Sequence, residues 1–126
     1  EGDNSMEQAQ TSRQIAVHFD GGTVVYQLND SPAADALLAQ LPLTVEVEDF
    51  STNEKIFYPP QALDTAGTPL AEGDAGVLAY YAPWGDVVMF YGRFGTNSSL
   101  YELGQAVSSQ ELIRGMSGAV TIDAVR

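Results

Sequence analysis

The most chemically suggestive side chain is Arg93, which lies in the run Tyr91-Gly92-Arg93-Phe94-Gly95. The flanking glycines let the backbone approach a ligand closely. A guanidinium between aromatic rings can bind a carboxylate or a carbonyl group, or stack on a flat ring. The competing interpretation is that Arg93 pairs with one of the 17 acidic side chains, as surface arginines commonly do. Arg93 is therefore a candidate ligand contact, but it does not indicate a reaction.

Aromatic side chains are the second group of candidates, because ligand pockets are mostly apolar with few polar groups. Trp84 stands in a turn and is the best contact candidate among them, and Phe94 follows Arg93 directly. Strand aromatics commonly pack in a core, so both roles stay open for each ring. The candidate ligand-binding residues are Arg93, Phe94, Trp84, Tyr81, Phe90 and Tyr58.

Hydrolytic chemistry and metal binding find little support in the sequence. His18 is the only histidine and there is no cysteine, so a zinc site has neither thiolates nor a second imidazole. No Gly-x-Ser-x-Gly elbow is present to carry a nucleophilic serine. Glu46, Glu48 and Asp49 lack the spacing of an EF-hand calcium loop, which favours a solvated strand face. We therefore assign no catalytic residue and no metal ligand.

The composition describes one acidic domain. The chain has 126 residues, with 17 acidic against 5 basic side chains and a net charge of −12, which argues against nucleic acid or a membrane surface as partner. Residues 1–14 are polar and without periodicity, so we expect a disordered tether followed by a folded domain over residues 15–126. Such a start resembles the segment after an export signal or lipid anchor. We therefore expect an extracytoplasmic location, with a cytoplasmic one as the alternative. The oligomeric state stays open.

The element that must position the candidate residues is the stretch Val77–Gly95. Its two apolar runs, Val77–Tyr81 and Val87–Tyr91, flank the sequence Ala82-Pro83-Trp84-Gly85-Asp86, which has the composition of a turn. We predict an antiparallel hairpin that is apolar on both faces. Strands of this kind lie within a barrel or sandwich, covered by other elements.

Shorter strand patterns surround this hairpin, together with one clear helix. Ser31 is the expected N-cap of that helix, and Pro42 is expected to end it. Ser108 and Glu111 predict a capping box for a second short helix. The expected strands cover residues 15–19, 23–28, 43–49, 55–58, 100–107 and 119–125, and residues 61–76 are expected to form a long loop. Together these elements predict a small closed or nearly closed β-barrel.

Three separated motifs resemble the bacterial cyclophilin-like family of small, largely uncharacterised proteins. They are Asn29-Asp30-Ser31-Pro32-Ala33-Ala34, then Leu41-Pro42-Leu43-Thr44-Val45, and finally Tyr80-Tyr81-Ala82-Pro83-Trp84-Gly85-Asp86 followed by Phe90-Tyr91. The likeness extends from about Ile15 to Val125. It implies a mainly β fold, a closed antiparallel barrel of eight strands with one or two capping helices.

The resemblance implies the fold without the activity. Cyclophilins proper are peptidyl-prolyl isomerases with an Arg in a run that ends in Gln-Gly-Gly-Asp. The corresponding region here, Lys55-Ile56-Phe57-Tyr58-Pro59-Pro60-Gln61, has neither feature. We therefore expect a domain that lacks the isomerase residues and binds a peptide or small ligand in an aromatic groove near Arg93, without a cofactor. The alternatives are an isomerase with a rearranged site and a flavin-binding accessory protein, the latter suggested by the family's association with flavodoxin-type proteins.

Overall fold

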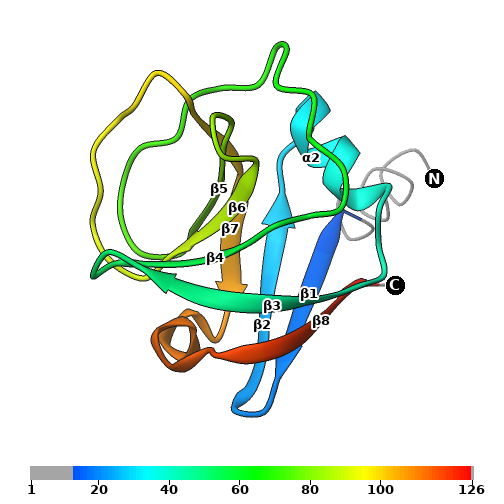
Figure 1. The fold of residues 1–126 in the computed structure, drawn as a ribbon, viewed down its shortest axis with the longest axis vertical. Helices are drawn as coiled ribbons and strands as arrows, with labels where there is room; N and C mark the ends of the chain where they lie inside the picture. The colour runs from blue at the N-terminus through cyan, green and yellow to red at the C-terminus, as the bar shows by residue number, and fades with distance from the viewer. Residues whose placement is uncertain (1–12, 126) are drawn as a thin grey trace, which may run out of the picture.

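Eight strands close into an antiparallel barrel in the order β1-β2-β7-β5-β6-β4-β3-β8 (Figure 1), which confirms the predicted fold class. The computed structural model describes residues 13–125. The strands are β1 Gln14–Phe19, β2 Gly22–Leu28, β3 Leu43–Phe50, β4 Glu54–Phe57, β5 Val77–Tyr81, β6 Asp86–Phe90, β7 Leu100–Ser108 and β8 Gly118–Ala124. Because β1 also pairs with β8, the ring is closed and every described strand has a hydrogen-bonded neighbour on both sides.

The central hairpin is apolar on both faces because the barrel buries both of them. One face of β5 and β6 turns into the barrel, where Leu78, Tyr80 and Val87 join the main core. The other face turns outward, where Ala79 and Val88 join a smaller core beneath the loops that precede β5 and follow β6. Because each face of the hairpin is buried in its own core, neither β5 nor β6 needs a polar face.

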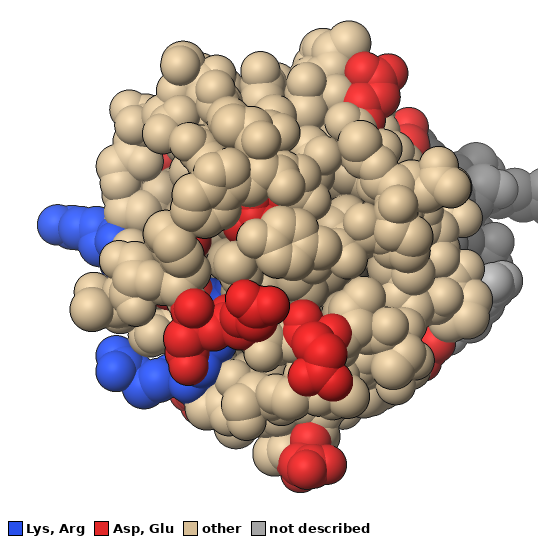
Figure 2. Space-filling view, viewed as in Figure 1, with Lys and Arg blue, Asp and Glu red and all other residues tan. Residues whose placement is uncertain are grey.

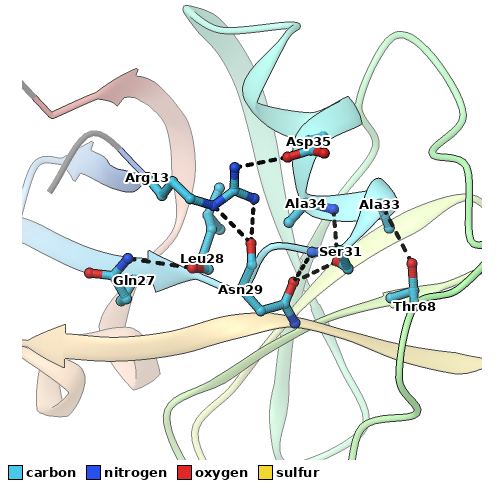
Figure 3. A network of polar contacts seen from close by, with 9 residues as sticks. All are labelled: Arg13, Gln27, Leu28, Asn29, Ser31, Ala33, Ala34, Asp35 and Thr68. Carbon is cyan, nitrogen blue, oxygen red and sulfur yellow. Dashed lines mark hydrogen bonds and ion pairs between the residues drawn. The ribbon is translucent and has the colours of Figure 1, made fainter. Parts of the chain in front are cut away.

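A network of polar contacts fixes the start of the helix α2, Pro32–Leu38 (Figure 3). Ser31 is its N-cap, as predicted, and its hydroxyl accepts a hydrogen bond from the Ala34 N–H at 3.2 Å. The Asn29 side chain holds this turn in place: it accepts from the Ser31 hydroxyl at 2.5 Å and donates to the Glu102 carbonyl at 2.7 Å. The helix is thereby tied to β7.

Arg13 joins the same network from the start of the described chain. Its guanidinium pairs with Asp35 at 2.8 Å and donates through Nε to the Asn29 carbonyl at 3.1 Å (Figure 3). Gln14 opens β1, one residue before the expected domain start at residue 15. Most of the expected tether, residues 1–12, lies outside the described residues.

The prediction of a capping box at Ser108 was wrong. The second helix, η1, is a 3₁₀ turn over Gln110–Gly115, and it is preceded by Ser109, whose backbone is left-handed with φ 61° and whose side chain makes no cap. Ser108 is still paired with Val25 in the sheet, so its hydroxyl is not placed over the first turn of the helix. The long pairing of β7 with β2 therefore moved the start of this helix.

Candidate functional site

An open cleft of about 510 Å³ lies on the outer face of the barrel, above β4, β5 and β6. Its walls come from the tip of the β5–β6 hairpin, from the end of β3 and from the loop of residues 91–99. The volume falls within the range of about 300–1,000 Å³ that is usual for small-ligand pockets. The lining residues are Phe50, Ser51, Asn53, Glu54, Tyr81, Trp84, Asp86, Val88, Phe90, Phe94, Gly95, Thr96, Asn97 and Leu100.

Aromatic rings form the upper part of the cleft. Trp84 meets Phe50 edge to face, with ring centres 5.0 Å apart at 88°, and meets Tyr81 at 5.6 Å and 81°. Trp84 stays 51% exposed and Phe50 41% exposed, so the hairpin tip presents ring surface to an incoming molecule. The nearly perpendicular rings support one another, because a ring edge is electropositive and a ring face electronegative.

A second aromatic pair holds the loop that forms the opposite wall. Phe94 stacks on Phe90 with ring centres 3.7 Å apart and planes 10° apart. The Phe94 N–H donates to the carbonyl of Gly73 at 3.1 Å, which ties the loop to the segment before β5. Because Phe90 belongs to β6, the stack anchors this wall directly on the barrel.

Two carboxyl groups, Glu54 and Asp86, line the base of the cleft. The strand register places both on one face of the sheet. Glu54 of β4 pairs with Phe90 of β6, and Asp86 begins β6 at an even spacing from Phe90, so the three side chains point to the same side. Asp86 is only 2% exposed, and its Oδ1 has no hydrogen-bond partner among residues 13–125. Burial raises the pKa of the Asp86 carboxyl. Burial, followed by the negative charge of Asp86, also raises the pKa of Glu54.

Asn53 adds a third acceptor beside these carboxyl groups. Its Nδ2 donates to the carbonyl of Arg93 at 3.0 Å, which fixes the orientation of the amide. Its Oδ1 is buried and has no partner within the described part of the chain. The backbone carbonyl of the same residue accepts from the Tyr91 N–H at 2.9 Å, so two hydrogen bonds tie Asn53, in the β3–β4 turn, to the loop after β6.

The structure brings together four of the residues that the sequence suggested, namely Tyr81, Trp84, Phe90 and Phe94. Arg93 and Tyr58 lie outside the lining of this cleft. The Arg93 side chain is exposed, and its contact with the site is made by its backbone carbonyl. Tyr58 is 47% exposed and follows the end of β4.

Sequence reasoning missed Phe50, Asn53, Glu54 and Asp86 as members of the site. Asp86 carried a usable signal, because a carboxylate that begins a strand apolar on both faces has no polar surface to occupy. Phe50 and Asn53 gave no such signal. Phe50 ends β3 and Asn53 lies in the β3–β4 turn, and the proximity of both to the β5–β6 hairpin follows only from the pairing of β4 with β6.

Other side chains that could bind a ligand or take part in a reaction lie away from the cleft. His18 is half exposed, 3.0 Å from the Thr23 hydroxyl and 3.5 Å from an Asp123 oxygen. Among residues 13–125, no group of three or more histidine, aspartate or glutamate side chains is placed to hold a metal ion. A second hollow between α2 and residues 60–62 is lined by alanine, glutamine and proline. No helix of the described chain is long and apolar enough to span a membrane.

The chain matches one protein family and is similar in fold to a solved structure. Residues 17–124 match a family described as the Cyclophilin-like family. The chain is also similar to the solution structure of the hypothetical protein AF2241 from Archaeoglobus fulgidus, with a TM-score of 0.69 and 15% sequence identity over 92% of this chain and 97% of that chain. At that identity the likeness concerns the fold alone. A search of curated proteins finds no match.

Proposed function

This chain belongs to the cyclophilin-like family, and from that premise we propose that its barrel binds a peptide or a small ligand in the cleft between the hairpin tip and the loop of residues 91–99. The observation that carries the proposal is the pairing of exposed rings with a buried, unpartnered acceptor at the base. Trp84 and Phe50 offer apolar surface, while Asp86 Oδ1 offers a hydrogen bond. Apolar walls with a few polar groups are the usual composition of a ligand site.

Binding without catalysis is favoured over prolyl isomerisation. In isomerisation the C–N bond loses its double-bond character, and a cation that acts only on the twisted amide would lower the barrier. The charged side chains that line this cleft, Glu54 and Asp86, are acidic. The same groups disfavour a flavin nucleotide, whose phosphate would meet like charge.

The residues that line the cleft give a direct test, because Trp84, the single tryptophan of the chain, Gly95 and Asn97 each have a backbone amide there. We expect members of a fragment library and of a capped peptide library to shift the amide resonances of Trp84, Gly95 and Asn97 in the labelled protein. Trp84→Ala should weaken the best binder about tenfold or more, as loss of an interface tryptophan does. Val107→Ala, an exposed apolar residue of β7 that does not line the cleft, should change affinity less than about twofold.

Two further variants test whether Tyr58 and Arg93, which do not line the cleft, contact the ligand. If Tyr58→Ala or Arg93→Ala weakens binding as much as Trp84→Ala does, the ligand extends beyond this cleft. Shifts confined to another face of the barrel would contradict the proposal. A proline-isomerisation assay on the same protein tests the enzymatic alternative: acceleration that is lost in Arg93→Ala would replace the binding-only interpretation.

A further inference from the structure

The cleft has a chemical bias that narrows its ligand class, and this inference rests on the function proposed above. Its base offers acceptors, in Asp86 Oδ1 and Asn53 Oδ1, that have no partner among residues 13–125. A buried acceptor without a partner costs free energy, which an incoming N–H or O–H group relieves. Both atoms therefore favour a ligand that donates hydrogen bonds.

The charge of the site favours a donor that is also a cation. Glu54 and Asp86 line the cleft, and no lysine or arginine is among its lining residues. Lys55 follows Glu54 in β4, so its side chain leaves the opposite face of the strand, where Nζ pairs with Asp49 at 2.5 Å. A cation placed in the cleft would thus meet two carboxyl groups without a competing positive charge in the lining.

The rings above the carboxyl groups suit an organic cation better than a metal ion. Phe50 and Tyr81 each stand nearly perpendicular to Trp84, at 88° and 81°, and all three rings line the cleft. An ammonium group near a ring face is attracted by the ring's quadrupole, and this attraction grows as water is removed. The alkyl part of such a ligand would pack on the same rings.

The surface beside the cleft points the same way. Exposed Glu46 and Glu48 alternate along β3 on the same face as Phe50, which stands at the cleft wall. Figure 2 shows acidic side chains gathered over β3, and basic side chains toward the left of the same face, one group of them directly beside the acidic cluster. A surface of one sign raises the local concentration of ions of the opposite sign and speeds their association.

We propose that this cleft selects organic ammonium ions that keep at least one N–H, either a free alkylamine or the lysine side chain of a peptide, over neutral molecules of the same shape. Asp86 and Asn53 accept the N–H groups, Glu54 supplies the second negative charge, and Phe50, Tyr81 and Trp84 enclose the alkyl part.

The test uses pairs of probes of similar shape, one charged and one neutral, titrated into the full chain and followed by the amide resonances of Trp84, Gly95 and Asn97. Butylammonium is compared with 1-butanol, and the capped peptide acetyl-Gly-Lys-Gly-amide with the same peptide carrying acetyl-lysine. We expect each charged probe to bind about tenfold more tightly than its neutral partner, a difference of about 1.4 kcal/mol. A tighter lysine peptide would identify a peptide ligand, and tighter butylammonium a free amine.

Charge-neutralising variants assign the selectivity to the cleft. Asp86→Asn should weaken butylammonium about tenfold and leave 1-butanol unchanged, whereas Asp20→Asn, an exposed carboxylate in the β1–β2 turn outside the lining, should change neither by more than about twofold. If Asp86→Asn does not fold, Glu54→Gln takes its place. Equal affinity of charged and neutral probes, or no shift with any charged probe, overturns this proposal. If library fragments still bind at the cleft, the proposed function survives; if none binds, both fall.

Discussion

Tyr81 and Asp86 face each other as the last pair of the β5–β6 hairpin, which puts an aromatic ring and a buried carboxyl side by side on the outer face of the barrel. Gly85, with φ 74°, closes the turn between them through its N–H, which donates to the Tyr81 carbonyl at 2.9 Å. The four-residue turn lifts Trp84 over this pair. One short turn thus places Tyr81, Trp84 and Asp86 together in the cleft.

Asp86→Asn is expected to stabilise the protein at neutral pH. Burial raises the pKa of Asp86 above its ordinary value of 3.8, so the folded protein keeps this proton longer than the unfolded chain does. The contribution of Asp86 to stability is therefore present below pH 3.8 and is lost as the pH rises through the raised value. The variant should match the wild type near pH 3 and exceed it by about 1 kcal/mol at pH 7.

Urea unfolding of both proteins across this pH range measures the effect. Asp20→Asn, in the exposed turn between β1 and β2, serves as the control and should give a difference that stays small at every pH. A variant less stable than the wild type at pH 7 would mean that the ionised Asp86 is stabilised in the folded state.

Two buried tyrosines should respond in opposite directions to loss of the hydroxyl group. The Tyr26 hydroxyl is fully buried and has no partner among the described residues, so Tyr26→Phe should be neutral or stabilising by up to about 1 kcal/mol. The Tyr80 hydroxyl accepts from the Leu63 N–H at 3.2 Å, so Tyr80→Phe should cost about 1–2 kcal/mol. Thermal unfolding of the two variants checks the difference in sign; a loss of equal size in both would contradict it.

The Asn29 side chain is expected to contribute strongly to the stability of the fold, because it makes three hydrogen bonds. It bonds the Ser31 N–H at 3.1 Å, the Ser31 hydroxyl at 2.5 Å and the Glu102 carbonyl at 2.7 Å. Asn29→Ala should therefore lower the free energy of unfolding by about 2 kcal/mol or more. Asn97→Ala removes one local bond in an exposed turn, to the Ser99 N–H at 2.8 Å, and should cost about 0.5 kcal/mol in the same urea titration.

Gly104 allows β7 to approach β2 closely. A Cβ atom at this position would lie 2.2 Å from the Gln27 carbonyl oxygen and 2.9 Å from Leu28 Cα, and both are backbone atoms. Gly104→Ala should cost more than about 3 kcal/mol or prevent folding. Gly115→Ala meets nothing within 4 Å and should stay within about 0.5 kcal/mol of the wild type. Circular dichroism during thermal unfolding separates the two outcomes, and similar melting temperatures would refute the close approach.

The sequence predicted the barrel well because its signals are local. Alternation of apolar and polar side chains marked β1 and β3, and the Ser31-Pro32 pair marked the start of α2. The start of η1 was missed, because the pairing of Ser108 with Val25 depends on a strand far away in the chain. Because Ser108 is held in β7, it does not cap a helix, and η1 begins at Gln110 instead.

The sequence by itself determined that residues 77–90 form a hairpin buried on both faces, since nearly every side chain in its two strands is apolar. It also determined the excess of acidic groups. Only the tertiary structure decided that Phe50 meets Trp84 and that Glu54 and Asp86 share one cleft. The physical reason is that β3 and β4 reach β6 through pairing across the closed sheet, which no local pattern of residues encodes.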